Sequence, residues 1–245
     1  DDFNDAIFFV TSNPITAIET SNMEVISYSS NDEDEDGVSD NYDDYPNDAD
    51  KAFNNYYPGE NSFGSLAFED LWPGKGDYDF NDLVVDYNIN EVTNGDNKVV
   101  EIVATFVVKA VGASNINGFG FQMDISPSKV TSVTGLNLTE NMINLQSNNL
   151  EAGQSKAVVV VFDNAKKLFP NTNTFINTLK SEPTLQSDTV NVVIKLTDPT
   201  PSIDLGYAPY NPFIFIDKTR GREVHLPGNE PTDKVSQGYF QTRDD

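Results

Sequence analysis

Cysteine is absent from the 245 residues, and histidine is represented only by His225. The lack of cysteine excludes disulfides, thiolate metal sites and cysteine nucleophiles. A single histidine excludes a zinc site built from several histidines, and no G-x-S-x-G motif is present to suggest a serine hydrolase. We therefore predict that the protein is not an enzyme and that His225 has a structural role.

Long hydrophobic runs are also lacking. No stretch of about 18 apolar residues occurs, so we predict no transmembrane segment in this chain. No signal peptide is recognisable, and the chain opens with Asp1 instead of Met. Its last residues carry no obvious stop, so we expect the natural protein to extend in both directions, with a truncated C-terminal domain.

Basic residues are scarce, with 15 Lys and Arg against 39 Asp and Glu, which gives a formal net charge of −24. Such a chain should repel nucleic acid and anionic lipid. The acids are concentrated, because residues 31–86 hold 17 of them and only Lys51 and Lys75. Packed carboxylates repel one another unless something neutralises them, so this window favours divalent cations as partners.

The densest acidic stretch, DEDEDGVSDNYD at residues 32–43, follows the spacing D-x-D-x-D-G-φ-x-D-x-x-D. Calcium takes roughly six to eight oxygen ligands, and a glycine after the third acid allows the chain to wrap around the ion. The alternative is a solvated acidic tether that needs no such spacing. We predict a calcium site whose ligands are Asp32, Asp34, Asp36, the carbonyl of Val38, Asp40 and Asp43.

Two further ion sites are predicted from neighbouring acids. One would use oxygens that follow the first loop, from Asp43, Asp44, Asn47, Asp48 and Asp50. The other lies in GDYDFND at residues 76–82, where an extended chain would place Asp77, Asp79 and Asn81 on one face, near Glu69 and Asp70. For this motif, hydrogen-bonded turn chemistry at a strand entry is an equally good explanation.

Short β-prone runs separated by turn signals dominate the chain from residue 63 onward. In residues 100–108 alternate positions are apolar, as one buried face of a strand requires. Helix signals are weak and limited to a turn or two at 165–169 and 174–179. We predict a mainly β fold, an antiparallel, jelly-roll-like β-sandwich with a metal-ordered acidic linker. The expected strands are 6–10, 23–28, 64–68, 82–89, 99–111, 119–125, 129–133, 157–163, 189–196, 212–216 and 223–226.

A D-F-N-D repeat at residues 2–5 and 79–82 is followed in both places by three apolar or small residues. It suggests two modules, so we predict three parts. They are the end of a preceding β module at 1–30, the acidic linker at 31–52 and a β-sandwich domain at 53–245.

Residues 53–87, FNNYYPGENSFGSLAFEDLWPGKGDYDFNDLVVDY, and 211–228, NPFIFIDKTRGREVHLPG, resemble the LruC-domain family of exported bacterial surface proteins and lipoproteins, common in Bacteroidetes. The acidic stretch, continued as DDYPND, resembles the calcium repeats of thrombospondin type 3. These resemblances imply export to the outer membrane, cell surface or periplasm, with a lipid anchor possible for the family but not encoded in this chain. They imply no known activity.

The leading functional hypothesis is a non-enzymatic, calcium-stabilised surface module for display or adhesion, with a glycan or another surface protein as partner. A carbohydrate-binding module is the alternative, in which Trp72 and tyrosines would stack on sugars, although we expect Trp72 to be buried. A hydrolase that uses Asp77, Asp79 or His225 is the third hypothesis. We expect Arg220 and Arg222 to pair internally with Glu223 or with the acidic clusters.

Overall fold

The computed structural model describes residues 31–170 and 175–239. The described residues from Asp32 onward belong to one compact unit, which contains both the acidic segment and all the strands. The strands expected at 6–10 and 23–28, the first copy of the D-F-N-D repeat and the module at 1–30 lie outside the described residues.

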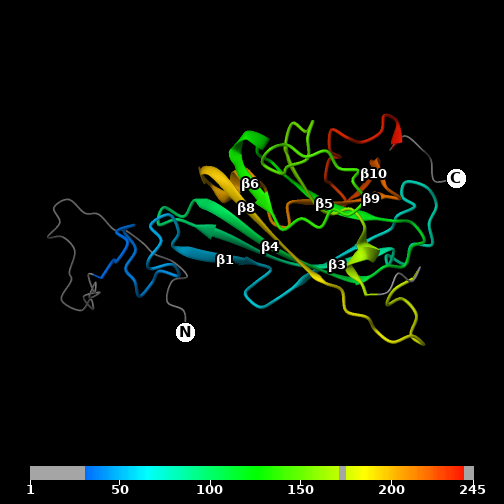
Figure 1. Cartoon of the computed structure of the whole chain (residues 1–245), viewed down its shortest axis with the longest axis horizontal. Coiled ribbons are helices and arrows are strands. Elements are labelled where there is room, and N and C mark those ends of the chain that lie inside the picture. The colour runs from blue at the N-terminus through cyan, green and yellow to red at the C-terminus, as the bar shows by residue number, and fades with distance from the viewer. Residues whose placement is uncertain (1–30, 171–174, 240–245) are drawn as a thin grey trace, which may run out of the picture. The chain divides into compact units, whose positions relative to one another are not determined.

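The larger sheet has six antiparallel strands in the order β1-β3-β4-β8-β6, with β2 pairing with β3 as well (Figure 1). Its centre is the long hairpin of β3 and β4. One half of β3 pairs with β2 and the other half with β1. The strands are β1 (Phe53–Tyr57), β2 (Gly64–Phe68), β3 (Leu83–Thr93), β4 (Val99–Ala110), β6 (Val130–Thr134) and β8 (Thr189–Thr200).

The smaller sheet has four antiparallel strands in the order β10-β9-β5-β7. They are β5 (Gly118–Met123), β7 (Ala157–Phe162), β9 (Asn211–Ile216) and β10 (Thr219–His225). Only short helices occur among the described residues, namely η2 (Pro127–Lys129), η3 (Ala165–Leu168) and α1 (Ser202–Leu205). None of the described helices is long and apolar enough to cross a membrane.

The two sheets pack face to face through an aromatic core. The ring of Phe106 on β4 lies 5.3 Å from that of Phe119 and 5.9 Å from that of Phe121, both on β5. Phe119 also stacks on Phe162 of β7, at 5.6 Å. Such aromatic pairs add to the free energy gained by burying apolar area. This arrangement confirms the predicted antiparallel β-sandwich.

The outer face of the smaller sheet is covered as well. Val158, Val160, Phe213 and Phe215 form a second buried cluster, against which Leu138, Met142 and Ile143 pack. Both faces of β5 and β7 are therefore buried, which explains why β7 (AVVVVF) is apolar throughout instead of alternating.

Buried ion pairs lie on β10, and one of them joins this strand to the segment before β7. Arg220 pairs with Glu223 and, at 2.7 Å, with Glu151, and its guanidinium lies 4.8 Å from the ring centre of Phe213. The ring nitrogens of His225 face Glu223 at 2.8 Å and Asn211 at 2.6 Å. The predicted Arg220–Glu223 pair is thus confirmed, and both nitrogens of the single histidine contact structural partners.

Three local expectations are wrong. The polar strand β1 (FNNYY) was not predicted, because it has no apolar alternation. Residues 175–179, the described part of the expected helical turn at 174–179, form no helix. In β4 it is Val99 and not Val100 that is fully buried, because a bulge between Val99 and Glu101 shifts the alternation.

Candidate metal centres

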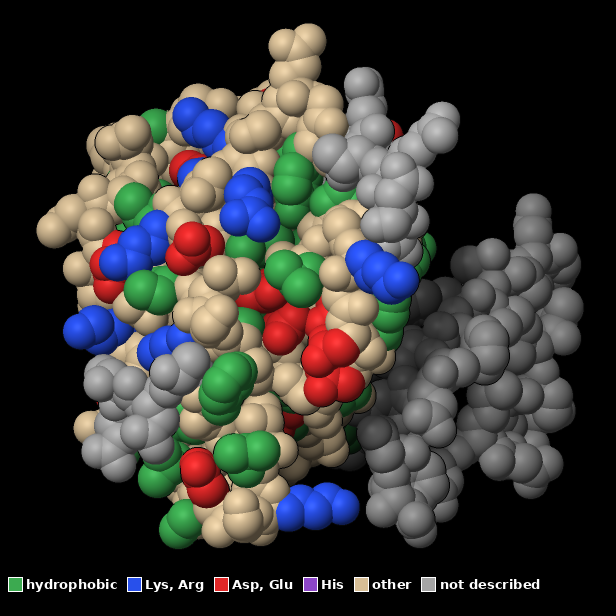
Figure 2. All heavy atoms as spheres, turned by 90° about the vertical axis from the view of Figure 1, so that its right-hand side faces the viewer, with side chains coloured by type: hydrophobic (Ala, Val, Ile, Leu, Met, Phe, Trp, Pro, Cys, Tyr) green, Lys and Arg blue, Asp and Glu red, His purple; other side chains and the backbone are tan. Residues whose placement is uncertain are grey.

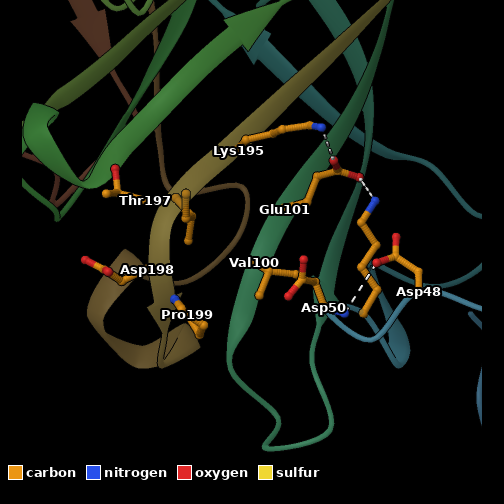
Figure 3. Close-up of a pocket in the computed structure, with 10 residues that line it drawn as sticks. Asp48, Asp50, Val100, Glu101, Lys195, Thr197, Asp198 and Pro199 are labelled. Atoms are coloured by element: carbon orange, nitrogen blue, oxygen red, sulfur yellow. Dashed lines mark hydrogen bonds and ion pairs between the residues drawn. The ribbon is translucent and has the colours of Figure 1, made fainter. Parts of the chain in front are cut away.

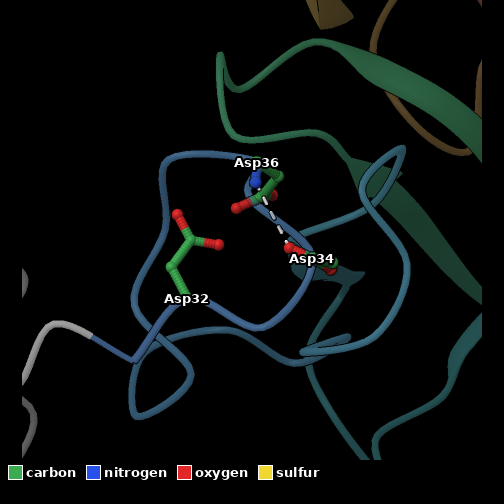
Figure 4. Close-up of side chains that lie close together, drawn as sticks. All are labelled: Asp32, Asp34 and Asp36. Carbon is green, nitrogen blue, oxygen red and sulfur yellow. Dashed lines mark hydrogen bonds between the residues drawn. The ribbon is translucent and has the colours of Figure 1, made fainter.

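The acidic segment curls so that its alternating aspartates turn inward. Asp32, Asp34 and Asp36 are half-buried, whereas Glu33 and Glu35 between them are exposed. Positive φ angles at Glu35 (62°) and Gly37 (94°) produce the curl. One carboxylate oxygen from each of the three aspartates lies within 4.8 Å of those of the other two (Figure 4).

Each of these aspartates uses one oxygen to hold the backbone of the loop. Asp32 Oδ2 accepts the N–H of Gly37 at 3.0 Å, Asp34 Oδ1 that of Asp36 at 3.3 Å, and Asp36 Oδ1 that of Val38 at 2.7 Å. The other oxygen of each is buried and has no hydrogen-bond partner among the described residues. Buried, unpaired carboxylate oxygens are costly, so these three oxygens are candidate ligands for a cation.

A fourth carboxylate, that of Asp43, lies near this cluster and repeats its hydrogen-bond pattern. Asp43 is only 8% exposed, its Oδ1 accepts the N–H of Tyr45 at 2.6 Å, and its Oδ2 is buried without a partner. Burial raises the pKa of Asp43, and the nearby charges of Asp36 and Asp34 raise it further. Nearby, Asp40 Oδ1 accepts the N–H of Glu33 at 2.9 Å and so helps to close the curl.

The curl is anchored on the larger sheet. The N–H of Ala52 donates to the carbonyl of Thr93 at the end of β3, at 2.7 Å. At the β3–β4 turn, a Cβ on Gly95 would lie 3.0 Å from the carbonyl oxygen of Asp36 and 3.4 Å from its carboxylate. The acidic segment is therefore packed against the hairpin, and Gly95 allows the close approach.

The oxygens predicted for a second neighbouring ion are not drawn together in this way. The set was Asp43, Asp44, Asn47, Asp48 and Asp50. Asp44 Oδ2 is occupied by the backbone and side-chain N–H groups of Asn54, at 2.8 and 3.0 Å. Asp48 and Asp50 line a shallow polar pocket beside the Lys51–Glu101 ion pair of 2.9 Å (Figure 3). Among the described residues, no member of this set belongs to a group of three carboxylates whose oxygens lie within 4.8 Å of one another.

The second acidic cluster lies between β2 and β3. Carboxylate oxygens of Glu69, Asp77 and Asp79 come within 4.8 Å of one another. Glu69 is 4% exposed, and neither of its oxygens has a hydrogen-bond partner among the described residues. Asp77 and Asp79 are exposed. The cluster therefore has a buried base and an open side.

Two more buried carboxylates surround Glu69. Burial raises the pKa of Asp82 to about 6, and the neighbouring Glu69 and Asp77 carboxylates add to the effect. Asp82 Oδ2 accepts the N–H of Asp70 at 2.8 Å, and Asp70 accepts from the amide of Asn117 at 2.8 Å. The pKa of Asp70 is also raised, chiefly by burial. Ionised together, these groups repel one another strongly.

The GDYDFND segment is not extended, which corrects the predicted geometry. Tyr78 and Phe80 have φ angles of 57° and 54°, so simple alternation fails and Asp82 lies beside Glu69 instead of opposite Asp77. Asn81 donates to the Asp79 carboxylate. Asp77 and Asp79 of the predicted trio thus gather with Glu69, which is expected nearby from the sequence, whereas Asn81 is not part of this group. Asp82, which the extended geometry placed on the other face, lies beside Glu69.

Aromatic side chains of the same segment are exposed, which overturns the expectation for Trp72. Trp72 is 46% exposed, and Tyr78 and Phe80 are exposed as well. Figure 2 shows the face of the molecule at the right of Figure 1, where acidic side chains gather and hydrophobic ones lie around them.

The fold and the clusters define an antiparallel β-sandwich with two oxygen-lined acidic centres. The chain belongs to the family described as Domain of unknown function (DUF4842), whose model matches residues 97–245. Its fold is similar to the crystal structure of a protein from Bacteroides ovatus described as a "putative lipoprotein", with a TM-score of 0.52 and 18% sequence identity. That match covers 77% of this chain and 57% of the other. No curated protein matches the sequence.

Proposed function

We propose that this protein is a non-enzymatic surface module whose acidic segment is folded around a calcium ion. The observation that supports it is the set of four buried carboxylate oxygens without hydrogen-bond partners, from Asp32, Asp34, Asp36 and Asp43. Each belongs to a side chain whose other oxygen already holds the backbone. Oxygens of Asp32, Asp34 and Asp36 lie within 4.8 Å of one another, so this part of the loop is arranged to present oxygens to one ion.

Calcium is the cation that this donor set suits best. It prefers oxygen ligands and accepts the irregular geometry of a loop, whereas zinc prefers nitrogen and sulfur. The resemblance of the segment to thrombospondin type 3 repeats agrees with this choice. An ion that binds only the folded state stabilises it, by about 2.7 kcal/mol when its concentration is about 100 times the dissociation constant.

An exported location agrees with a calcium-dependent fold. Extracellular modules bind calcium with dissociation constants of about 10⁻⁴–10⁻³ M, so even a weak site would be filled outside the cell. The LruC-domain resemblance and the fold shared with the Bacteroides ovatus protein point the same way. We propose that the module serves display or adhesion on the cell surface or in the periplasm, where a lipid anchor would lie outside this chain.

Thermal unfolding in excess EDTA and in millimolar calcium, with metal analysis of the purified protein, tests this proposal. At about 100 times the dissociation constant, calcium should raise the midpoint by about 5–10 °C for a chain of this size. The double variant Asp34→Ala, Asp36→Ala should lose most of that response. A matched control, Asp188→Ala, changes an exposed aspartate outside both clusters and should keep it. No bound metal and no shift in the wild type would contradict the proposal.

A further inference from the structure

We infer that Glu69, Asp77, Asp79 and Asp82 form a second calcium centre, open on one side, where a neutral carbohydrate binds through two vicinal hydroxyls on the ion and an apolar ring face on neighbouring aromatic side chains. This inference goes beyond the stabilising role of the acidic segment and does not depend on it.

The buried base of the centre gives the first reason. Glu69 is 96% buried and has two carboxylate oxygens without a partner among the described residues, in reach of Asp77 and Asp79. Asn117, whose amide nitrogen donates to the adjoining Asp70, is 1% exposed and its Oδ1 is also unpartnered among the described residues. The neighbour within hydrogen-bond reach of Glu69 is another carboxyl group, Asp82, which brings no positive charge, and a cation would supply it.

Glycines around the centre leave room for the Glu69 carboxylate and for Asn81. At Gly76 a Cβ would lie 3.1 Å from Glu69 Oε2, so any other residue there would press on the carboxylate. At Gly112 a Cβ would lie 1.6 Å from the side-chain oxygen of Asn81, next to Asp82. The N–H of Gly112 donates to the carbonyl of Asn81 at 2.8 Å and thereby holds the start of the segment that carries Asp82.

The open side distinguishes this centre from the acidic segment. Asp77 and Asp79 are exposed, whereas Asp32, Asp34 and Asp36 of the first cluster are half-buried. Calcium takes roughly six to eight oxygens, and four carboxylates leave positions that water or an external ligand must fill. Those positions face solvent on the side of Asp77 and Asp79.

The aromatic side chains indicate what the external ligand is. Trp72, Tyr78 and Phe80 lie in the same segment as the ligating carboxylates and are 46%, 42% and 53% exposed. Figure 2 shows acidic side chains with hydrophobic ones around them on the face of the molecule at the right of Figure 1. Sugars combine adjacent hydroxyls that can chelate calcium with apolar C–H faces that stack on aromatic rings. The dense negative charge disfavours an acidic ligand, so the expected sugar is neutral.

The test uses the double variant Asp34→Ala, Asp36→Ala, so that only the second centre can bind. Calcium alone is titrated calorimetrically into this protein and into the same protein with Glu69→Gln. Asp79→Asn, at an exposed position, serves as a second variant that leaves the buried base intact, and Asp188→Asn serves as the charge-matched control. One calcium bound in the parent and the control, and at least tenfold weaker binding with Glu69→Gln or Asp79→Asn, are expected.

Retention on immobilised mannan, galactan and β-glucan is then measured for the wild-type protein in calcium and in EDTA. The inference expects retention on at least one of them in calcium, loss in EDTA, and at least tenfold weaker retention for Trp72→Ala or Phe80→Ala. Absence of calcium binding by the double variant would overturn the centre. Calcium binding without retention on any of the three, or retention that EDTA leaves unchanged, would overturn the carbohydrate role.

Discussion

Replacing Asp36 by asparagine should stabilise the protein without calcium and destabilise it with calcium. The carboxylate oxygen of Asp36 lies within 4.8 Å of those of Asp32 and Asp34. Two unit charges at this separation repel by about 1 kcal/mol in water and by about 3 kcal/mol at an effective dielectric constant near 20. Because these side chains are half-buried, removal of two such pairs should gain roughly 2 kcal/mol.

The substitution is nearly isosteric, and asparagine keeps an acceptor oxygen for the N–H of Val38, which donates to Asp36 Oδ1 at 2.7 Å. For a chain of this size, roughly 2 kcal/mol corresponds to a rise of about 4–8 °C in the EDTA midpoint. In calcium the variant lacks one charged ligand, so its midpoint should fall below that of the wild type.

Thermal unfolding followed by circular dichroism at low ionic strength, where screening is weakest, measures the midpoint in EDTA and in calcium. Asp188→Asn, an exposed aspartate outside the clusters, should change neither midpoint appreciably. A lower midpoint for Asp36→Asn in EDTA would refute the reasoning, because it would show that the ionised carboxylate stabilises the loop by its own hydrogen bonds.

Three further outcomes are expected. Gly112→Ala should destabilise the fold by about 1–3 kcal/mol in urea unfolding, because its Cβ would meet Asn81 at 1.6 Å; an unchanged midpoint would contradict this. Burial raises the pKa of Asp82 from 3.8 to about 6, so the stability lost by ionising it accrues between these two values and is complete above pH 6. In EDTA, Asp82→Asn should be more stable than the wild type near pH 7.5, by roughly 2 kcal/mol, and the difference should shrink as the pH falls below 6 and vanish only below about pH 4. His225 and Arg220 lower the pKa of Glu223 despite its burial. The stability that ionised Glu223 contributes is therefore present above about pH 4.5 and is lost as the pH falls through its folded pKa. Glu223→Gln should cost roughly 3 kcal/mol in urea unfolding near pH 7, and the difference from the wild type should narrow in acid.

Most strands could be predicted because alternation and turn signals are local properties of the chain. Ile102, Ala104, Phe106 and Val108 are all buried on one face of β4, as their spacing predicts. The exceptions have physical causes. Strand β1 is recognised only by its pairing with β3, and the bulge at Val99 depends on the partner strand β8.

The two candidate centres were predictable to different extents, because local spacing can be read from the sequence whereas contacts made by the tertiary structure cannot. Asp32, Asp34 and Asp36 alternate in one short loop, and their spacing predicts that their carboxylates come together, as the structure shows. In the second cluster the left-handed φ angles of Tyr78 and Phe80 break the extended geometry on which the prediction relied. Glu69 follows the end of β2, and its local sequence does not predict that its carboxylate is buried without a hydrogen-bond partner.

Strand β3 separates the two acidic clusters, since it begins directly after Asp82 and ends at Thr93, against which the acidic segment is anchored. Eleven residues of antiparallel strand span about 35 Å. Electrostatic interactions between exposed charges fade over about 8 Å at physiological ionic strength. Calcium bound at one end of the sheet should therefore not change the calcium affinity at the other end. A calcium-binding isotherm of the intact protein should then be the sum of two independent curves, without positive or negative cooperativity.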